Sequence, residues 1–428
     1  MAERLLVVAD QLPHPPRNGI TLPLSHWLVQ LARKYELRLV LLRPENQPLD
    51  SVARAENERR FGPLIEATVV RQSRGVRVLE ELRGDGMYQH GWRADDVHEL
   101  LALDAGWRSA PVLVSPISAL AKWRAVRVAA PALTPRATVA AVHDCTAAEY
   151  RWRYRSPQPG VWGRVKAWSH HLRAPLVARA EGALLAGADR VLVQTVADLA
   201  ALRDLVGPAT AARGLVVPNG VRAELFDVAA APLSGSTVLF VAELSGEYGA
   251  TTEWLCQRVW PAVRANVPEA RLCIVGRGAS AALRARIAAT AGVEHVEFVV
   301  DLAPVYAQCS VVWSPLWKGF GLINKTLEAM AAARPVVGGR AAFNGIDGFV
   351  DGRHGVGLAT AMAAAMAEAT VSLLLDGARA RSIGAAAREL VHVAFRWESA
   401  AERIQEALSA AHPASLALPA PSLELTLR

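Results

Sequence analysis

Cysteine is scarce in this chain of 428 residues, and long uninterrupted hydrophobic runs are missing. The cysteines are far apart and form no C-x-x-C pair; they are Cys145, Cys256, Cys273 and Cys309. This spacing argues against a zinc site or a disulfide framework and favours a reducing compartment. The apolar run at residues 5–9 is too short for a secretory signal peptide. We therefore expect a cytoplasmic protein.

Residues 355–375 are the longest stretch rich in Ala, Leu and Val, but Glu368 interrupts it and Ser and Thr lie nearby. A membrane-spanning helix needs about 20 predominantly apolar residues. We therefore expect this stretch to be an alanine-rich helix of a soluble protein.

Three catalytic motifs are also absent from the sequence. Without a D-x-D pair, the chain lacks the acidic residues that hold a metal-bound nucleotide in many sugar transferases. Without G-x-x-x-x-G-K-[ST], a P-loop nucleotidase is excluded, and without G-x-S-x-G an α/β-hydrolase is disfavoured. We expect no metal site and no bound cofactor.

The composition is that of a globular protein, with 52% apolar and 20% charged residues. A chain of this length exceeds one ordinary hydrophobic core, which predicts two domains. The formal net charge of +7 favours acidic partners without identifying them.

Short apolar runs alternate with stretches of helical periodicity along almost the whole chain. The predicted strands are residues 5–9, 37–42, 67–71, 111–115, 137–142, 190–194, 214–218, 237–242, 271–275, 296–300, 310–314 and 335–339. This alternation predicts an α/β protein with doubly wound parallel sheets.

The pattern is interrupted by PNGV at 218–221 and by APLSGS at 231–236, and we place the hinge between two domains there. We therefore expect an N-terminal domain over 1–220 and a C-terminal domain over 221–395. A helix over 396–411 is expected to pack back toward the N-terminal domain, and 412–428, rich in Pro, Ala, Ser and Leu, to form a loose tail.

Ligands of such sheets bind at the carboxyl ends of the strands, so the loops after the strands are the candidate sites. Gly19 ends a proline-rich loop directly before a helix and either lets backbone amides approach a sugar or phosphate or simply suits a stiff turn. His143 is either a base or hydroxyl-binding imidazole, or a hydrogen-bonded strand end. Gly276 and Arg277 stand in a Gly-x-Gly that phosphate binding and close packing explain equally well.

The stretch GFGLINKTLEAMAAARPVVGG, residues 319–339, carries Lys325 and Glu328 on the first turns of an alanine-rich helix. Residues three apart share a helix face, and the helix N-terminus is electropositive. Lys325 and the free amides could hold a phosphate, with Glu328 accepting hydroxyls of the group that carries it. The alternative is an ion pair on a solvated helix face.

Residues 151–180 contain seven Arg or Lys, three Trp and no acidic residue. Cations mixed with aromatic residues suit a phospholipid headgroup layer or a nucleic-acid backbone with stacked bases. The remaining alternative is a solvated basic face whose tryptophans cover the core. We expect peripheral membrane contact through this segment in preference to nucleic-acid binding.

Six stretches in order resemble a known family. They are residues 191–202, 218–221, 260–278, 296–316, 319–337 and 395–404. On these motifs the chain resembles the retaining glycosyltransferases of family 4, with the GT-B fold of two facing Rossmann-like domains. It is closest in style to bacterial sugar transferases of polysaccharide assembly.

The resemblance implies transfer of a hexose from a nucleotide diphosphate, UDP- or GDP-linked, to a hydroxyl acceptor. A lipid-linked saccharide is one candidate acceptor, at the inner face of the membrane. It assigns catalysis to His143 and Lys325, with Lys325 on the diphosphate and His143 beside the acceptor. Binding of the nucleotide sugar is assigned to Gly19, Gly276, Arg277, Asp301, Phe320, Gly321, Leu322, Ile323, Lys325 and Glu328.

Two departures from the family stand out. Phe320 replaces the first glutamate of the family motif, and Glu243 and Glu247 stand where an Arg and a Lys are frequent. These losses keep open a non-catalytic GT-B protein that binds a sugar nucleotide or a partner enzyme. A sugar-nucleotide epimerase is less favoured, because the acid and base that it needs are not apparent.

Overall fold

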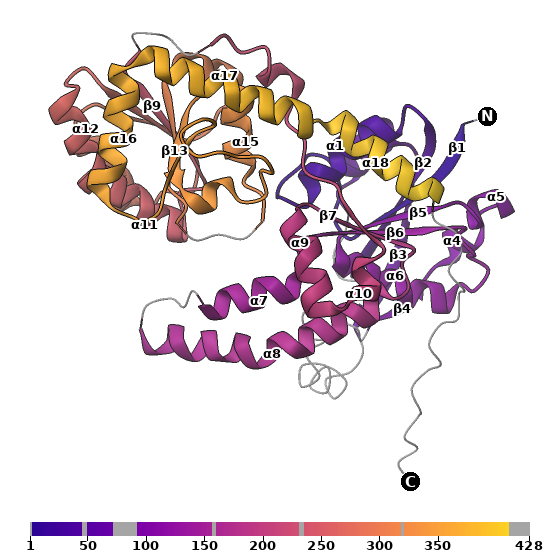
Figure 1. Ribbon diagram of the computed structural model, residues 1–428. Helices are drawn as coiled ribbons and strands as arrows, with labels where there is room; N and C mark the ends of the chain where they lie inside the picture. Colours follow the sequence, from indigo (N-terminus) through magenta and orange to yellow (C-terminus); the bar gives the residue numbers. More distant parts are fainter. Residues whose placement is uncertain are drawn as a thin grey trace. The chain divides into compact units, whose positions relative to one another are not determined.

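Figure 1 shows a computed structural model of the chain, which describes residues 2–44, 49–71, 92–155, 160–230, 235–317 and 321–410. The chain divides into two compact units, Met1–Val217 with Ala400–Arg428, and Pro218–Ser399. The division falls at the start of the PNGV stretch, rather than between PNGV and residues 231–236 where we placed the hinge.

The first unit is built on a sheet of order β4-β3-β2-β1-β5-β6-β7-β8. All neighbouring strands are parallel except β3 and β4, which pair antiparallel at one edge. The strands are β1 Glu3–Ala9, β2 Tyr35–Pro44, β3 Leu64–Arg71, β4 Trp92–Asp96, β5 Val112–Ser115, β6 Thr138–His143, β7 Arg190–Val193 and β8 Gly214–Val216.

Helices connect these strands, as the alternating pattern predicts. They are α1 Thr21–Leu31, α2 Ser51–Phe61, α4 His98–Leu101, α5 Ala105–Arg108, α6 Ile117–Ala129, α7 Thr146–Arg155, α8 Val161–Leu185, α9 Val196–Ala201, a π-helical turn Leu202–Val206 and α10 Pro208–Ala211. The last helix, α18 Trp397–Ala410, joins this unit from Ala400 onward. There Arg403 donates to the Val216 carbonyl at 2.8 Å.

The second unit contains a fully parallel sheet of order β11-β10-β9-β12-β13-β14. Its strands are β9 Thr237–Val241, β10 Arg271–Val275, β11 Val293–Val296, β12 Val311–Ser314, β13 Val336–Gly339 and β14 Val356–Leu358. Its helices are a 3₁₀ turn Ala223–Leu225, α11 Gly246–Trp254, a π-helical turn Leu255–Val259, α12 Trp260–Asn266, α13 Ala281–Ala289, α14 Ala303–Gln308, α15 Asn324–Ala331, a 3₁₀ turn Arg340–Phe343, α16 Ala363–Leu375 and α17 Gly377–Ala394.

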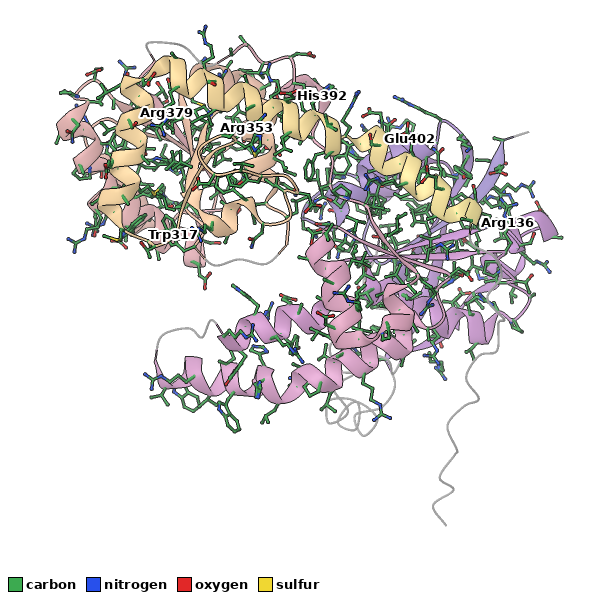
Figure 2. The ribbon with its side chains drawn as sticks, in the orientation of Figure 1. Arg136, Trp317, Arg353, Arg379, His392 and Glu402 are labelled. Carbon is green, nitrogen blue, oxygen red and sulfur yellow. The ribbon has the colours of Figure 1, made fainter. Side chains whose placement is uncertain are left out.

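Both sheets are covered by helices, and side chains fill the space between the layers of each unit (Figure 2). Strands buried on both faces must be apolar throughout, which is why continuous apolar runs predicted most of the central strands correctly. In the second unit, Trp260 of α12 and Trp313 of β12 meet edge to face, with ring centroids 6.1 Å apart. Each unit therefore has its own core, and both Rossmann-like layouts agree with the predicted fold class.

Two predicted elements are wrong in their bounds. The strand expected at 296–300 is instead β11, Val293–Val296, because the neighbouring strand β10 ends at Val275, opposite Val296. Beyond that point Val300 is 91% exposed. The helix expected over 355–375 starts only at Ala363, since Val356–Leu358 pairs with β13 as edge strand β14.

Among the helices that the structure describes, none combines the length and the hydrophobicity that crossing a bilayer requires.

Candidate functional site

The residues predicted to bind a nucleotide in the second unit follow the carboxyl ends of its strands. The strand order reverses between β9 and β12, so the loops after these two strands flank the switch point of the sheet. Ligands of open parallel sheets bind in the crevice at such a point. Helix α15 starts shortly after β12, and the glycine loop at 276–278 follows β10, next to β9.

Helix α15 is anchored at its first turn to the end of β12. Thr326 is fully buried, and its hydroxyl lies 2.9 Å from the Ser314 hydroxyl. The N-cap residue is Ile323, whose side chain cannot cap the helix. The first N–H groups of a helix lack intrahelical partners, so this end offers amides to an anionic ligand.

Lys325 and Glu328 contact each other on this helix. Lys325 Nζ lies 3.0 and 2.8 Å from the two carboxylate oxygens of Glu328. The lysine side chain is 46% exposed and that of Glu328 only 15%. The i,i+3 ion pair that the sequence offered as the alternative to a phosphate site is thus formed. It places one cation and one anion beside the start of the helix.

Tyr306, on α14, also contacts Glu328. Its hydroxyl donates to Glu328 Oε2 at 3.4 Å, and its side chain is fully buried. Burial, with the nearby carboxylate of Glu328, holds the pKa of Tyr306 well above its ordinary value. The tyrosine therefore stays a neutral donor that fixes the orientation of the Glu328 carboxylate.

The loop Gly276–Gly278 is confined by the backbone of the neighbouring strand. A Cβ at Gly276 would lie 1.8 Å from the Ala242 carbonyl oxygen, so close packing alone requires glycine there. A Cβ at Gly278 would lie 2.2 Å from Glu243 Oε1. An acid therefore stands beside the loop where the family frequently has a cation. The Arg277 guanidinium lies over the Phe298 ring, 3.8 Å from its centroid.

Asp301 follows β11 and pairs with Arg222, with 3.3 Å between Oδ1 and Nη2. Arg222 was not predicted, although it directly follows the PNGV stretch. The Asn219 side-chain amide of that stretch donates to Asn324 Oδ1, the first residue of α15, at 2.9 Å. Residues 219–222 thus contact both the start of α15 and the loop after β11.

The run before α15 is described only in part. Phe320 lies outside the described residues. Gly321 has a φ of +77°, which glycine adopts without strain. Leu322 is buried in the core beside Leu327, while Ile323 is half-buried at the helix start. Packing in the core therefore explains Leu322 without a ligand.

In the first unit, Gly19 lies in the loop between β1 and α1. Its backbone does not have a left-handed φ, and within the described part of the chain a Cβ there would meet nothing within 4 Å. Neither the turn nor packing requires glycine, so the stiff-turn explanation is not supported. Asn18 organises the loop by accepting from the Ile20 and Thr21 amides at 3.0 and 2.9 Å.

His143 ends β6 in a left-handed conformation, with a φ of +68° that is unusual for a residue with a Cβ. Its ring stacks on Trp27, 5.6 Å between centroids. The Gln194 amide nitrogen lies 3.2 Å from Nδ1, which makes Nδ1 an acceptor, and Nε2 donates to the Ser115 hydroxyl at 3.0 Å. Burial lowers the pKa of His143 to about 4, so this neutral, held ring suits a fixed contact better than proton abstraction.

Asp144 follows His143, and its buried oxygen Oδ1 has no hydrogen-bond partner among the residues that the structure describes. Burial, together with the nearby carboxylates of Asp198 and Glu149, raises the pKa of its carboxyl to about 7. Because folding raises this pKa above its ordinary value of 3.8, the contribution of Asp144 to stability is full below that value and is lost as pH rises through about 7.

Asp144→Asn should remove this pH dependence. The wild type is expected to lose at least about 1 kcal/mol of stability relative to the variant between about pH 5 and 8, since one pKa unit corresponds to about 1.4 kcal/mol. Urea unfolding at both pH values measures this difference. The exposed Asp204→Asn serves as the control, and the account of Asp144 fails if both variants follow the wild-type pH profile.

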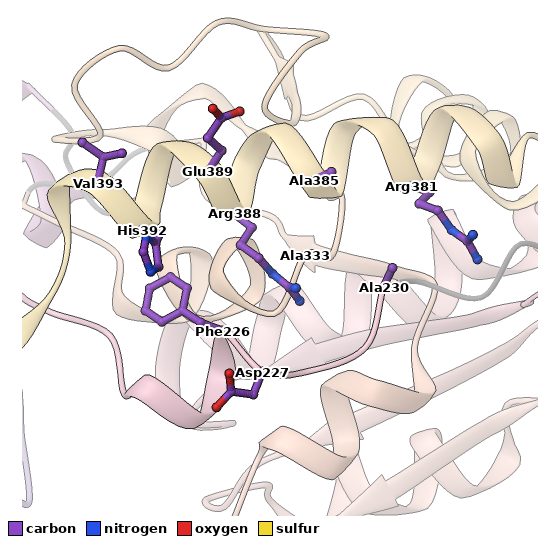
Figure 3. Close-up of a pocket in the computed structure, with 10 residues that line it drawn as sticks. All are labelled: Phe226, Asp227, Ala230, Ala333, Arg381, Ala385, Arg388, Glu389, His392 and Val393. Atoms are coloured by element: carbon purple, nitrogen blue, oxygen red, sulfur yellow. The ribbon is translucent and has the colours of Figure 1, made fainter.

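A pocket of about 470 Å³ on the second unit contains none of the predicted site residues (Figure 3). Arg388 points into it from α17, but its guanidinium donates to the carbonyls of Ala331 and Val228. His392 packs edge to face on Phe226. These side chains hold α17 against the end of α15 and against residues 226–228, and we regard the pocket as structural.

Residues 235–376 of the chain match the family described as "Glycosyl transferases group 1". This span contains β9 to α16, with the glycine loop, Asp301, Lys325 and Glu328. The second unit carries a group 1 glycosyl transferase domain. The chain is also 31% identical over 166 residues to the GDP-mannose-dependent α-(1-6)-phosphatidylinositol monomannoside mannosyltransferase of Mycolicibacterium smegmatis. That match covers 36% of this chain and 43% of the relative, less than half the relative's length.

Solved structures extend the likeness in fold to both units of this chain. Anabaena HepE in complex with UDP-glucose aligns with a TM-score of 0.62 at 17% identity, over 95% of this chain and 99% of that one. Sucrose-phosphate synthase from Thermosynechococcus elongatus aligns with a TM-score of 0.61 at 19% identity, over 95% and 98%. The fold is therefore GT-B, as the sequence motifs predicted.

Proposed function

We propose that the protein is a retaining, metal-independent glycosyltransferase of family 4 that moves a sugar from a nucleotide-diphosphate donor to a hydroxyl. The observation that carries this proposal is the pair Lys325–Glu328 at the uncapped start of α15, beside the switch point of the sheet. The group 1 glycosyl transferase domain around this pair supports the assignment.

The site offers different chemistry to the two ends of a nucleoside diphosphate. Lys325 and the first amides of α15 would stabilise the negative charge that develops on the leaving diphosphate. Glu328, oriented by Tyr306, would accept the ribose hydroxyls. Attack on the face that the leaving group vacates, with the donor phosphate taking the acceptor proton, gives retention without a side-chain base. His143 would then be a fixed, neutral contact beside the acceptor.

The proposal includes a saccharide acceptor that is linked to lipid, and a peripheral position of the protein at the cytoplasmic face of a membrane. The mannosyltransferase relative is named for a phosphatidylinositol monomannoside, which is a lipid-linked sugar. That name and the basic segment at 151–180 support the lipid-linked acceptor, and UDP and GDP are the candidate carriers of the donor sugar.

Thermal shift with UDP-, GDP- and TDP-sugars, followed by assay of nucleoside diphosphate release with each stabilising donor, tests the proposal. A ligand that binds only the folded state raises stability by RT ln(1 + [L]/Kd), so the true donor should be detected at excess. Stabilisation with release of diphosphate is the expected result. No stabilisation by any sugar nucleotide would contradict it.

One observation favours the alternative, a non-catalytic GT-B protein that binds a sugar nucleotide. Glu243 lies against the Gly276–Gly278 loop, where a carboxylate would repel a donor phosphate. Calorimetry separates the two functions: tight donor binding with neither hydrolysis nor transfer to saccharide acceptors supports the non-catalytic protein.

A further inference from the structure

The amino-terminal half of α8 projects from the first unit. Of the eight buried residues of the whole helix α8, seven lie at or after Ala174, and only Ala167 precedes them. In Figure 1 this half runs beside α7, beyond the sheet. Tyr154 of α7 stacks on His171 with ring centroids 4.3 Å apart, and Tyr150 meets His170 edge to face at 5.0 Å. The two helices are therefore held together as a hairpin.

The base of the hairpin is fixed by a buried carboxylate. Glu181 of α8 is fully buried and accepts from the Thr146 and Ala147 amides at 3.1 and 3.0 Å. An acid at this position satisfies the first N–H groups of α7 and complements the dipole of that helix. The exposed half of α8 is thus presented on a rigid support.

The outward face of this half is apolar. Val161, Val165, Trp168 and Leu172 are spaced i, i+4, i+7 and i+11, which places them on one side of the helix, and they are 74%, 53%, 60% and 58% exposed. Trp162 beside them is 83% exposed. One alternative from the sequence required the tryptophans of this segment to cover the core. The exposure of Trp162 and Trp168 contradicts it.

Cations flank this stripe. Arg164, Lys166 and Arg173 belong to the same half of α8, and residues 151–180 contain no acidic residue. An apolar stripe bearing Trp, bordered by Lys and Arg, is the composition of helices that lie in the plane of a lipid interface. Anionic headgroups attract such cations, and tryptophan favours the boundary between headgroups and acyl chains.

We propose that the outward face of α8, residues 161–173, binds the surface of an anionic membrane. A second copy of the chain fits less well, because pairing two such faces brings like charges together with no acid in the segment to offset them. Nucleic acid fits less well because the aliphatic Val161, Val165 and Leu172 offer bases no stacking surface. The inference rests on the proposed function only in that the membrane would carry the acceptor.

Vesicle flotation tests this surface without requiring turnover. The wild type should float with vesicles of phosphatidylcholine containing about a third phosphatidylglycerol, and less so at high salt, because the attraction is electrostatic. Trp162→Ser with Trp168→Ser should weaken binding at least about tenfold, and Arg164→Glu with Lys166→Glu should abolish it.

Two control pairs replace exposed apolar and exposed basic residues elsewhere in this unit. Val52→Ser with Val128→Ser, and Arg59→Glu with Arg203→Glu, should bind as the wild type does. Donor binding, measured in all variants, should be unchanged and separates failure of this surface from failure of the proposed function.

Three results would overturn the inference. They are a wild type that stays with the supernatant at every composition, serine variants that bind as the controls do, and binding of single-stranded RNA without binding of vesicles.

Discussion

Lys325→Ala should lower kcat/KM for the sugar-nucleotide donor by roughly ten- to over a hundredfold. The substitution removes a charge-assisted contact to the leaving diphosphate, which contributes about 1.5 to 3 kcal/mol, and each 1.4 kcal/mol or so corresponds to a factor of ten in rate. Release of nucleoside diphosphate from the donor, measured at several donor concentrations, gives this value.

Stability should change little in the same variant. Lys325 is 46% exposed, and exposed ion pairs contribute under about 1 kcal/mol. Arg59→Ala is a suitable control, because it breaks another exposed i,i+3 pair, with Glu56, on α2 of the other unit. If both Lys325→Ala and Arg59→Ala keep the activity of the wild type, Lys325 is a surface residue without a role in catalysis.

Glu328→Gln should weaken donor binding, with an expected loss of about 1.5 to 3 kcal/mol, because a neutral amide is a poorer acceptor for two ribose hydroxyls than a carboxylate. The shape of the side chain is kept, and Gln can still accept from the Tyr306 hydroxyl. Calorimetric titration with the donor identified by the screen measures the change in Kd.

Nucleoside monophosphates distinguish the roles of the two residues. A monophosphate retains the ribose but lacks the second phosphate, so Glu328→Gln should weaken monophosphate and diphosphate alike. Lys325→Ala should weaken mainly the diphosphate. Equal effects of both substitutions on both ligands would argue against separate ribose and diphosphate contacts.

Most of the parallel strands could be predicted because burial on both faces demands apolar runs. The half-buried edge strand β14, Val356–Leu358, lacks such a run and was expected to be helical. Strand β4 could not be predicted, since Trp92–Asp96 is mostly polar and pairs antiparallel at the sheet edge. The end of β11 was wrong because the apolar pattern of 296–300 continues past the end of its partner strand. A strand's length depends on its neighbour, which the local sequence does not contain.

The contact between Lys325 and Glu328 could be predicted, because helix geometry alone brings residues three apart together. Tyr306 and Arg222 could not: they lie 22 residues from Glu328 and 79 from Asp301, and only the fold brings these pairs together. For Gly276, phosphate binding and packing were equally open, and the Ala242 carbonyl shows that packing suffices. For Trp162 and Trp168, the composition of the segment left open whether the side chains are exposed, and the structure shows that they are.

The most direct test of the central claim is calorimetric titration of UDP and GDP into the wild type and into the double variant Lys325→Ala, Glu328→Gln. We expect one of the two nucleotides to bind the wild type and its Kd to rise at least about a hundredfold in the variant, since both contacts are lost. The same Kd for wild type and variant would contradict the account, because the nucleotide would then bind elsewhere.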